Sequence, residues 1–480
     1  MSVPLATGRV LATLNEDGSR RWIRPKPSSG TWLIRRRVVA YGLMALYLAI
    51  PHLRWNDKPW MQLDFPRREF TFFGTTFLPT DTLLLMLLFV SVLIGVFLLT
   101  ALFGRVWCGW ACPQTVWMEF LFRPIERLVE GSPNASRVLD RDKKHFAPRR
   151  LVKYAIYAVL AAVLGNTFLA YFAGTDSVLT WMTQSPFSHP TPFLVMAVTT
   201  LAVFLDFTWF REQTCLVACP YGRWQSALLD KQSIIVAYDA NRGEPRGHGV
   251  GARPGLGDCV ACNACVNTCP TGIDIRDGLQ MECIHCTQCA DACDDIMVKV
   301  GKPQGLIRYT SQDALAGKPP AFLRARTVLY PLAFVLFFGA FLVALATRSA
   351  ADVTMLGPIG APFTLEADGS VVNQVRIKVA NRSGTAQRYT IAYLDEPGAR
   401  LIAPENPLRL NAGASVTTSV FVIQPPSRFV DGERRVRFRI SDEGKFSREF
   451  NWRLPGPNSA GAPASAPASV PANAPAPESR

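Results

Sequence analysis

Leu83-Leu84-Leu85-Met86-Leu87-Leu88-Phe89-Val90 lies inside an uninterrupted apolar run that extends from residue 80 to residue 103. A helix needs roughly 20 mostly apolar residues to cross a bilayer. The chain has 480 residues, 49% of them hydrophobic, and long runs of this kind hold much of that content. The sequence therefore predicts a polytopic α-helical membrane protein with attached domains, because a soluble domain would spread its apolar residues more evenly.

Four further runs approach the same length, at 38–53, 151–173, 192–210 and 327–347. The first of these is the shortest and contains Pro51. We expect five membrane helices in all. The first four would form a membrane core over residues 35–210, and the fifth would occupy 327–347.

The distribution of Lys and Arg predicts the orientation. Basic residues precede the first run at 35–37 and are frequent at 104–150, whereas the loop at 174–191 has none. This places the N-terminal segment 1–34, the loop 104–150 and the segment 211–326 in the cytoplasm, although basic residues at 54–79 conflict with it. Five crossings then put the C-terminal domain in the periplasm and the chain in a bacterial inner membrane. The net charge of +14 lies beside apolar runs, which argues against a nucleic-acid partner and for the lipid bilayer.

Residues 350–455 have a different character. Apolar and polar residues alternate at 371–379, and similar stretches follow at 389–394, 416–423 and 435–440. Short alternating segments separated by Gly, Pro, Asn and Asp are typical of a β-sandwich of immunoglobulin type. The region contains no Cys or His, so we assign it no chemistry. Pro, Ala and Ser dominate 456–480, a composition that predicts a disordered tail.

Two four-cysteine runs within 211–326 predict a bacterial-type ferredoxin domain at about 250–310. The first is Cys259-x2-Cys262-x2-Cys265-x3-Cys269-Pro270, and the second is Cys283-x2-Cys286-x2-Cys289-x3-Cys293. Thiolates ligate iron–sulfur clusters, and in two-cluster ferredoxins the fourth cysteine of each run serves the other cluster. We therefore expect two [4Fe-4S] clusters, one on Cys259, Cys262, Cys265 and Cys293, the other on Cys283, Cys286, Cys289 and Cys269. Zinc is the alternative, since paired CxxC also binds zinc.

A second set of cysteines follows two of the predicted membrane helices. Cys108 and Cys112 precede Pro113, and Cys215 and Cys219 precede Pro220, at an offset of 107 residues. Spacing of i, i+4 predicts both sulfurs of a pair on one helix face, with the helix kinked or ended at the proline. The offset predicts a duplicated helical hairpin whose axis brings all four sulfurs to one point. Soft thiolates select Cu(I), zinc or a third iron–sulfur cluster. Four buried thiols that only pack the helix ends are the alternative.

Other polar residues give weaker signals. We expect Asp206, near the end of a membrane helix, to pair with Arg211. The stretch 126–150 reads as a solvated or headgroup-facing surface. His52 and His189 are too isolated in a chain with five histidines to indicate haem.

The sequence resembles the FixG/CcoG family (also called RdxA), the accessory proteins of cbb-type haem–copper oxidases. The resemblance extends to about Pro455. It rests most specifically on the segments 104–115, 242–247, 269–278 and 291–297, which read GRVWCGWACPQT, RGEPRG, CPTGIDIRDG and DACDDIM. Asp294 stands where ferredoxins usually have proline, and this departure is normal for the family.

The resemblance implies a cupric reductase that helps to mature the oxidase. Electrons would pass from a cytoplasmic donor through the two clusters to copper held at Cys108, Cys112, Cys215 and Cys219. A copper chaperone or copper-exporting ATPase, together with oxidase assembly factors, would be the partners. Two alternatives stay open. One is a quinol dehydrogenase similar to NapH-like proteins, and the other is a non-enzymatic assembly scaffold or redox sensor.

Overall fold

The computed structural model describes residues 12–457 except 16, 18, 56–57, 67–68, 78–80, 143–145, 249–254, 320–323, 384, 396–397 and 445. The predicted tail at 456–480 therefore lies almost entirely outside the described residues. The chain forms two compact units that divide between Ala346 and Thr347. The first unit holds all twelve cysteines and the helices of membrane length, and the second is built mainly from β strands.

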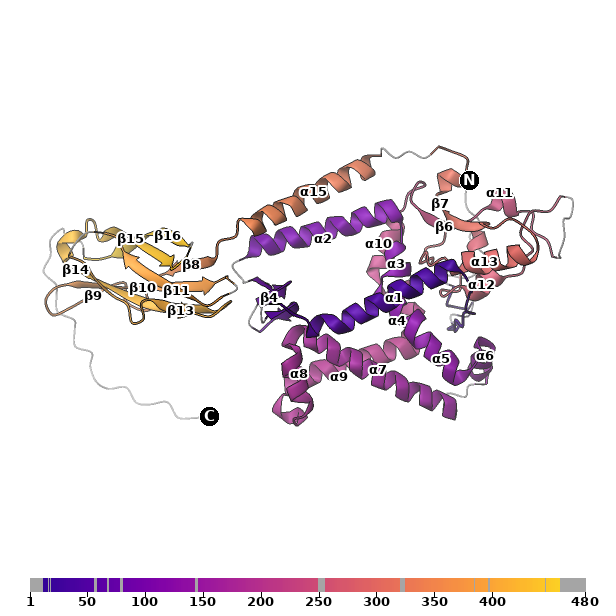
Figure 1. Ribbon diagram of the computed structural model, residues 1–480, viewed down its shortest axis with the longest axis horizontal. Helices are drawn as coiled ribbons and strands as arrows, with labels where there is room; N and C mark the ends of the chain where they lie inside the picture. The colour runs from indigo at the N-terminus through magenta and orange to yellow at the C-terminus, as the bar shows by residue number, and fades with distance from the viewer. Residues whose placement is uncertain are drawn as a thin grey trace. The chain divides into compact units, whose positions relative to one another are not determined.

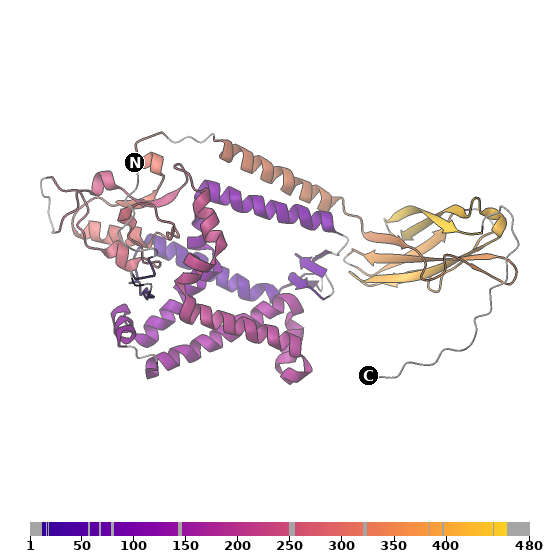
Figure 2. The ribbon, with the colours of Figure 1, turned by 180° about the vertical axis from the view of Figure 1, so that it is seen from behind.

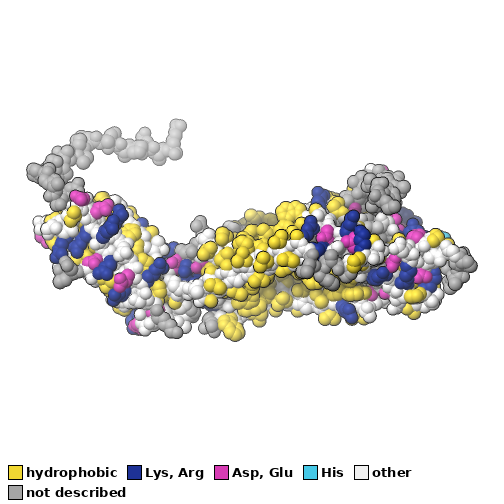
Figure 3. Space-filling model, turned by 90° about the horizontal axis from the view of Figure 1, so that it is seen from above, with side chains coloured by type: hydrophobic (Ala, Val, Ile, Leu, Met, Phe, Trp, Pro, Cys, Tyr) yellow, Lys and Arg dark blue, Asp and Glu magenta, His cyan; other side chains and the backbone are white. Residues whose placement is uncertain are grey.

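Four helices in the described part of the chain are long and apolar enough to cross a membrane. They are α2 (Thr82–Phe103), α7 (Pro148–Ala173), α9 with its π-helical extension η4 (Pro190–Phe210) and α15 (Ala325–Ala346). Their mean hydropathies are 1.8–3.0, and most of their surface is not buried by the protein. Figure 3 shows the continuous patch of hydrophobic side chains that results. Exposed apolar surface of this extent requires lipid around it.

The membrane helices pack in two pairs, α2 with α15 and α7 with α9 (Figure 1). Small residues allow close approach in both pairs. A Cβ atom at Gly165 of α7 would lie 2.4 Å from the Thr200 hydroxyl of α9, and one at Gly95 of α2 would lie 3.3 Å from the ring of Phe334 on α15. The short helices α8 (Thr175–Met182) and η3 (Pro186–Ser188) connect α7 to α9.

The first predicted membrane run forms α1 (Thr31–Ala49) and the turn η1 (Ile50–His52), but it is not among the four helices of membrane character. Three arginines at 35–37 occupy its beginning, so only 38–49 remain as an uninterrupted apolar stretch. The prediction of five membrane helices is thus confirmed for four. Figures 1 and 2 show α1 between the α2–α15 pair and the α7–α9 pair.

One series of short helices follows α2 and another follows α9, and each series contains one cysteine pair. After α2 come α3 (Val106–Trp110), α4 (Pro113–Trp117), the π-helical η2 (Met118–Phe122), α5 (Arg123–Glu130) and α6 (Pro133–Arg141). After η4 (Asp206–Phe210) come the π-helical η5 (Thr214–Ala218) and α10 (Pro220–Leu228).

The two copies share one backbone course, in agreement with the predicted duplication. Gly104 ends α2 at φ 60° and ψ −136°, and Arg211, 107 positions later, ends η4 at φ 56° and ψ −123°. Cys112 and Cys219 are both extended, at φ −60° and −76°, and each precedes a proline that begins the next helix. A left-handed residue is energetically unfavourable for arginine but not for glycine. The second copy therefore keeps a turn that its own sequence does not favour.

The ferredoxin domain consists of two helices and a two-stranded sheet. The helices are α12 (Ala264–Thr268) and α13 (Gln288–Lys299), and β6 (Ile235–Tyr238) pairs antiparallel with β7 (Ile307–Thr310). Short helices α11 (Ala240–Gly243), η6 (Ile275–Asp277) and α14 (Gln312–Leu315) complete it. The core packs Leu306 and Met297 against cluster-motif cysteines.

The ferredoxin domain is anchored to the rest of the first unit through the start of α1. The Asp291 carboxylate on α13 accepts hydrogen bonds from the backbone N–H groups of Trp32 at 3.2 Å and Leu33 at 2.7 Å. These N–H groups belong to the first turn of α1, where no helical partner exists and a negative charge is favoured. A Cβ atom at Gly30 would collide with the same carboxylate. The ferredoxin domain thus caps the N-terminus of α1.

Between η1 and α2 the chain forms short antiparallel strands that the sequence did not predict. They are β1 (Arg54–Trp55), β2 (Lys58–Pro59), β3 (Met61–Asp64), β4 (Glu69–Phe72) and β5 (Thr75–Phe77). β3, β4 and β5 pair in that order as one sheet.

The second unit is a two-sheet β-sandwich. One sheet has the order β12-β14-β10-β8, with β9 beside β10, and the other has the order β13-β11-β15-β16. The predicted strands are confirmed as β10 (Val371–Asn381), β11 (Gln387–Tyr393), β14 (Ser415–Gln424) and β15 (Glu433–Asp442). Inward side chains of β10 such as Val375 and Ile377 are fully buried. The other elements are β8 (Ala351–Leu356), β9 (Thr364–Leu365), β12 (Arg400–Ile402), β13 (Leu408–Leu410), η7 (Pro426–Arg428) and β16 (Ser447–Pro455).

Candidate redox centre

The first and second cysteine loops (259–269 and 283–293) have the same backbone shape. Ala261 and Asn263 of the first loop have φ of 52° and 57°, and His285 and Thr287 of the second have φ of 55° and 58°. None of these is glycine, so each left-handed residue stores strain of about 1–2 kcal/mol. Strain of this kind persists where the surrounding structure requires it, which is common at ligand-binding sites. Here it curls each CxxCxxC segment around a small cavity.

The eight cysteines of the two loops line two cavities. The first sulfur cavity is lined by Cys259, Cys262, Cys265 and Cys293. The second sulfur cavity is lined by Cys269, Cys283, Cys286 and Cys289, and Cys265 lines it as well. The last cysteine of each loop therefore reaches the cavity of the other loop, because α12 and α13 pack side by side.

The chemistry of this donor set fits iron–sulfur clusters. Burial raises the pKa of Cys283 to about 12 and the pKa of Cys286 to about 11. Buried thiols of this kind are neutral at physiological pH and become thiolates only beside a strong positive charge, such as a cluster's iron. Four or more thiols on each of two cavities are the donor set that two four-thiolate clusters require.

The first and second membrane motifs (108–113 and 215–220) differ from the simple helix-face prediction. Cys108 lies in α3 and Cys215 in η5, but Cys112 and Cys219 are outside any helix, in extended backbone. The prolines begin new helices and do not kink old ones, because proline at the first helical position loses no hydrogen bond. The second cysteine of each pair therefore leaves the helix surface.

The four membrane-motif thiols are close enough to influence one another electrostatically. Burial raises the pKa of the Cys215 thiol above its ordinary value, and negative charge on Cys112, Cys108 and Cys219 would raise it further. Thiols influence one another in this way only at short range. That the four sulfurs form one metal site stays a prediction.

The first membrane motif packs directly against the second cysteine loop. A Cβ atom at Gly109 would lie 2.6 Å from the carbonyl oxygen of Ile284 and 2.9 Å from that of His285. Only glycine permits this approach. Cys108 accordingly packs in one buried group with Ile284 and Cys286. A thiol of the membrane motif therefore belongs to the same buried group as a cysteine that lines the second sulfur cavity.

Hydrogen bonds hold this contact in register. The Trp110 indole donates to the Tyr309 hydroxyl at 2.9 Å, and that hydroxyl donates to the His285 carbonyl at 2.9 Å. The Arg105 backbone N–H donates to His285 Nδ1 at 3.2 Å. Burial lowers the pKa of His285 to about 3, so its ring is neutral and Nδ1 is free to accept. His285, for which the sequence carried no signal, thus connects the first membrane motif to the ferredoxin domain through hydrogen bonds.

Arg105 places a positive charge beside the first cysteine of the first membrane motif. Its guanidinium lies 3.9 Å from Cys108 Sγ, and Cys108 also donates to Gln225 Oε1 at 3.0 Å. Burial raises the pKa of Cys108 above its ordinary value, and the positive charge of Arg105 opposes that effect. Arg105 therefore favours the thiolate, the form of cysteine that binds soft metals.

A buried ion-pair network surrounds the site and corrects two predictions. The Glu126 carboxylate accepts hydrogen bonds from both terminal nitrogens of Arg211, at 3.0 and 3.1 Å. It also forms ion pairs with Arg24 and, at 3.4 Å, with Lys153. The predicted pairing of Arg211 with Asp206 is wrong, because Asp206 instead accepts from the Thr214 hydroxyl. The stretch 126–150 is likewise not uniformly a solvated surface, since several of its charged side chains are 4% exposed or less. These are Glu126, Glu130 and Arg150.

The network extends to the second sulfur cavity. Arg123 pairs with Glu119 and Glu212 and donates to the carbonyl of Pro270, which follows Cys269, at 3.1 Å. Glu119 accepts from Gln288, which precedes Cys289, at 3.2 Å. The i, i+4 spacing of Glu119 and Arg123 was the only signal of this network in the sequence. Charged residues beside apolar runs usually contact lipid headgroups, so their burial was not expected.

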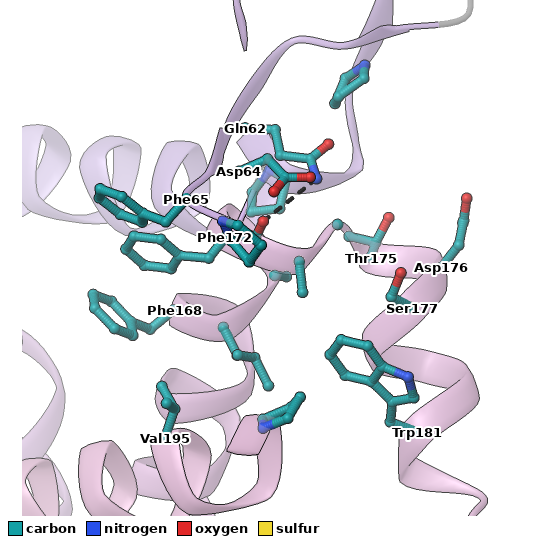
Figure 4. Close-up of a pocket in the computed structure, with 18 of the residues that line it drawn as sticks. Gln62, Asp64, Phe65, Phe168, Phe172, Thr175, Asp176, Ser177, Trp181 and Val195 are labelled. Carbon is teal, nitrogen blue, oxygen red and sulfur yellow. Dashed lines mark hydrogen bonds between the residues drawn. The ribbon is translucent and has the colours of Figure 1, made fainter. Parts of the chain in front are cut away.

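A separate cavity of about 730 Å³ lies where α7 ends and α9 begins (Figure 4). Phe168, Phe172 and Trp181 face it, and Gln62 of β3 donates to the Phe172 carbonyl at 3.4 Å. The cavity contains none of the chain's cysteines. It is therefore distinct from the redox centre.

Comparison with known proteins agrees with this geometry. A family model described as a 4Fe-4S binding domain matches residues 84–130, and one described as a 4Fe-4S dicluster domain matches 210–312. All twelve cysteines lie in these two segments. A third model, described as an IG-like fold at the C-terminus of FixG, matches 341–457.

Full-length relatives are also similar. The protein RdxA of Cereibacter sphaeroides is 37% identical over 79% of this chain and 83% of its own, and RdxB of that organism is 35% identical over 84% and 89%. The nitrogen fixation protein FixG of Rhizobium meliloti is 32% identical over 93% and 95%. The chain belongs to the FixG/RdxA family. The crystal structure of a FixG-related protein from Vibrio parahaemolyticus covers 23% of this chain at 14% identity and a TM-score of 0.21, so it adds no argument about the fold.

Membership in the FixG/RdxA family and the 4Fe-4S models define the general chemistry. The chain is a membrane iron–sulfur redox protein with a C-terminal immunoglobulin-like domain. The first membrane motif and the second cysteine loop pack together within the first compact unit.

Proposed function

We propose that the protein is a cupric reductase that delivers Cu(I) for assembly of a cbb-type haem–copper oxidase. One electron reduces each Cu(II) to Cu(I), and no proton or covalent bond is exchanged. Cu(II) favours nitrogen and oxygen ligands, whereas Cu(I) favours thiolates. A site of four thiols supplied with electrons therefore stabilises the reduced ion. A copper chaperone or a copper-exporting ATPase would receive it.

The packing of Cys108 and Cys286 with Ile284 in one buried group is the single observation that carries this proposal. Cys286 lines the second sulfur cavity, and Cys108 packs in the same buried group. We assign Cys269, Cys283, Cys286 and Cys289 as ligands of one [4Fe-4S] cluster and Cys259, Cys262, Cys265 and Cys293 as ligands of the other. Clusters of this type supply one-electron redox chemistry when bound. Copper held at Cys108, Cys112, Cys215 and Cys219 would then be within direct reach of the electron source.

The proposal includes an orientation for the chain. We assign α1 as a fifth crossing, which puts the ferredoxin domain and its electron donor in the cytoplasm and the immunoglobulin-like domain in the periplasm of a bacterial inner membrane. Contacts of α1 support this: the Tyr171 hydroxyl of α7 donates to the Tyr47 carbonyl at 2.8 Å, far along the spanning segment. Apolar side chains on α1, such as Val38 at 68% exposure, have no protein cover.

The test is copper reduction by the anaerobically purified, reduced protein. Cu(II) is added, Cu(I) is followed with a chelating dye, and cluster oxidation is followed by visible bleaching. The variant carries alanine at all four membrane-motif cysteines. The proposal predicts that the variant keeps about eight irons per chain, the content of two [4Fe-4S] clusters, but forms no Cu(I).

Other outcomes have definite meanings. If the wild-type protein contains about twelve irons and the variant about eight, the membrane motifs hold a third cluster and do not hold copper. The 4Fe-4S model over 84–130 favours this alternative. If the wild-type protein forms no Cu(I) at all, cupric reduction is wrong.

A quinol dehydrogenase is the second candidate, and the cavity in Figure 4 favours it. Its volume of about 730 Å³ and its aromatic lining suit a small amphipathic ligand. The cavity, however, meets the start of α9 and the cysteines follow the end of η4, so the span Pro190–Phe210 separates them by roughly 30 Å. A quinol added to the oxidised protein should bleach the clusters if this candidate is correct, and should have no effect if the cupric reductase is correct.

A further inference from the structure

Arg36 differs from its neighbours in the run Arg35-Arg36-Arg37. Arg35 and Arg37 are exposed, as expected for residues that mark the cytoplasmic side, whereas Arg36 is 0% exposed. A buried arginine needs a partner, because removing a charge from water is unfavourable unless an opposite charge replaces the water. Its role is therefore different from that of a topological signal.

The contacts of Arg36 leave most of its charge unpaired. Its Nε donates to the carbonyl of Gly109 in the first membrane motif at 2.9 Å, and its guanidinium lies 5.3 Å from the ring centroid of Phe120. Both terminal nitrogens are buried without a hydrogen-bond partner among the described residues. Orphaned donors of this kind indicate that an anionic group completes the site.

The second sulfur cavity is the source of that anion. Gly109, whose carbonyl accepts from Arg36, packs against the backbone of Ile284 and His285, the two residues between Cys283 and Cys286. Cys286 is on the wall of the cavity and in contact with the first membrane motif. Four thiolates around a cluster would give this cavity a net negative charge. Arg36 therefore contacts the part of the first membrane motif that packs against the second cysteine loop.

We propose that Arg36 is a positioning residue that neutralises the iron–sulfur cluster held by Cys269, Cys283, Cys286 and Cys289 and raises its reduction potential. The inference rests on the cluster ligands assigned under the proposed function. A nearby buried cation stabilises an added electron, so the reduced form is favoured. The hydrogen bond to Gly109 links the same guanidinium to the membrane motif, so one side chain holds both halves of the redox centre.

The experiment is a redox titration of the full-length, cluster-loaded protein, followed by electron paramagnetic resonance of the reduced clusters. Arg36→Gln removes the charge, and Arg36→Lys keeps it. Arg35→Gln and Arg37→Gln are matched controls, because each removes one charge from an exposed position on the same helix. Iron content is measured for every variant.

The expected result is a shift confined to one of the two clusters in Arg36→Gln. The shift should be at least tenfold toward the oxidised form, about 59 mV to lower potential for a one-electron couple. Arg36→Lys should keep most of the wild-type potential, and both controls should match the wild-type protein. If Arg36→Gln loses one cluster while Arg36→Lys retains both, the charge role is also supported.

Three results would overturn the inference. These are unchanged potentials in Arg36→Gln, equal shifts in Arg36→Gln and the two controls, or loss of iron in both Arg36 variants, which would show a packing role. Failure of the proposed ligands would appear separately, as a wild-type protein without two titrating clusters. Failure of cupric reduction alone would leave the titration unaffected.

Discussion

Gly109 and Ile284 touch so closely that a Cβ atom on Gly109 would lie 2.6 Å from the Ile284 carbonyl oxygen. Gly109 stands between the two cysteines of the first membrane motif, and Ile284 stands between two cysteines of the second loop. The contact is backbone against backbone, so neither side can rotate away. It makes the membrane motif and the ferredoxin loop one rigid centre.

Substituting Gly109 with alanine should therefore loosen this centre. Overpacking of a tight contact costs about 1–3 kcal/mol. We expect the rate of Cu(I) formation to fall roughly tenfold to a hundredfold, because displacement of about an ångström has effects of that size on reacting groups. The measurement is the dye assay together with iron content, which should stay at the wild-type value.

Gly42→Ala is the matched control for this substitution. A Cβ atom at Gly42 of α1 meets nothing within 4 Å. That variant should reduce copper at the wild-type rate. Equal rates for Gly109→Ala and the wild-type protein would show that the contact does not serve electron transfer.

The crossed sharing of cysteines can be tested with paired substitutions. Cys259 and Cys293 line the same cavity although they come from different loops, whereas Cys283 lines the other. The double variant Cys259→Ala/Cys293→Ala should lose one cluster, leaving about four irons per chain. The double variant Cys283→Ala/Cys293→Ala should lose both clusters. If the losses are reversed, each loop holds its own cluster and the assignment is wrong.

The buried Glu126 should be a major determinant of stability. Its carboxylate neutralises Arg211, Arg24 and Lys153. Removing one member of a buried ionic group typically costs 3–5 kcal/mol, because the remaining charges stay buried without compensation. Glu126→Gln should therefore lower the unfolding midpoint in detergent well below that of the wild-type protein. Asp295→Asn, which removes an exposed partner of Lys299, should change it little.

Acidification should destabilise the wild-type protein through the same network. Burial alone would raise the pKa of Glu126, but Arg211, Arg24 and Lys153 hold it well below its ordinary value of 4.5. A carboxyl group with a lowered pKa contributes stability that is present above its unfolded pKa and lost as the pH falls toward its folded pKa. Arg24 and Arg150 likewise lower the pKa of Asp140 against the effect of burial.

Unfolding midpoints measured between pH 7 and pH 3 would check this. The midpoint of the wild-type protein should be nearly constant near neutrality and should fall below about pH 4.5. The Glu126→Gln protein should show a shallower fall, since its side chain does not titrate. Parallel curves for the two proteins would mean that Glu126 does not contribute to the pH dependence.

Much of the fold was predictable because it depends on local patterns. Apolar runs such as 80–103 identify membrane helices without knowledge of their neighbours, and alternation at 371–379 identifies a strand of the sandwich. The weak case was the run at 38–53, which is short and follows three arginines. Length and hydropathy cannot decide whether such a helix crosses, because that depends on the helices that it packs against.

The candidate site divides in the same manner. Cysteine spacing alone predicted the two crossed sets in the loops and the duplicated pairs at 108–112 and 215–219, and in the structure the loop cysteines line two cavities. The fate of the charged residues was not predictable. Arg211 and Glu126 are 85 residues apart, and nothing near either one in the sequence identifies the other as its partner.

The sequence by itself determined the elements and the chemistry: membrane helices, a β-sandwich, and thiols spaced for iron–sulfur clusters. Only the tertiary structure decided how these meet. Ligand spacing is a local property of one loop, whereas the burial of Arg36 and the contact of Gly109 with Ile284 require segments from three parts of the chain to pack together. The physical reason is that desolvation and close packing act between surfaces, and a surface exists only after the chain has folded.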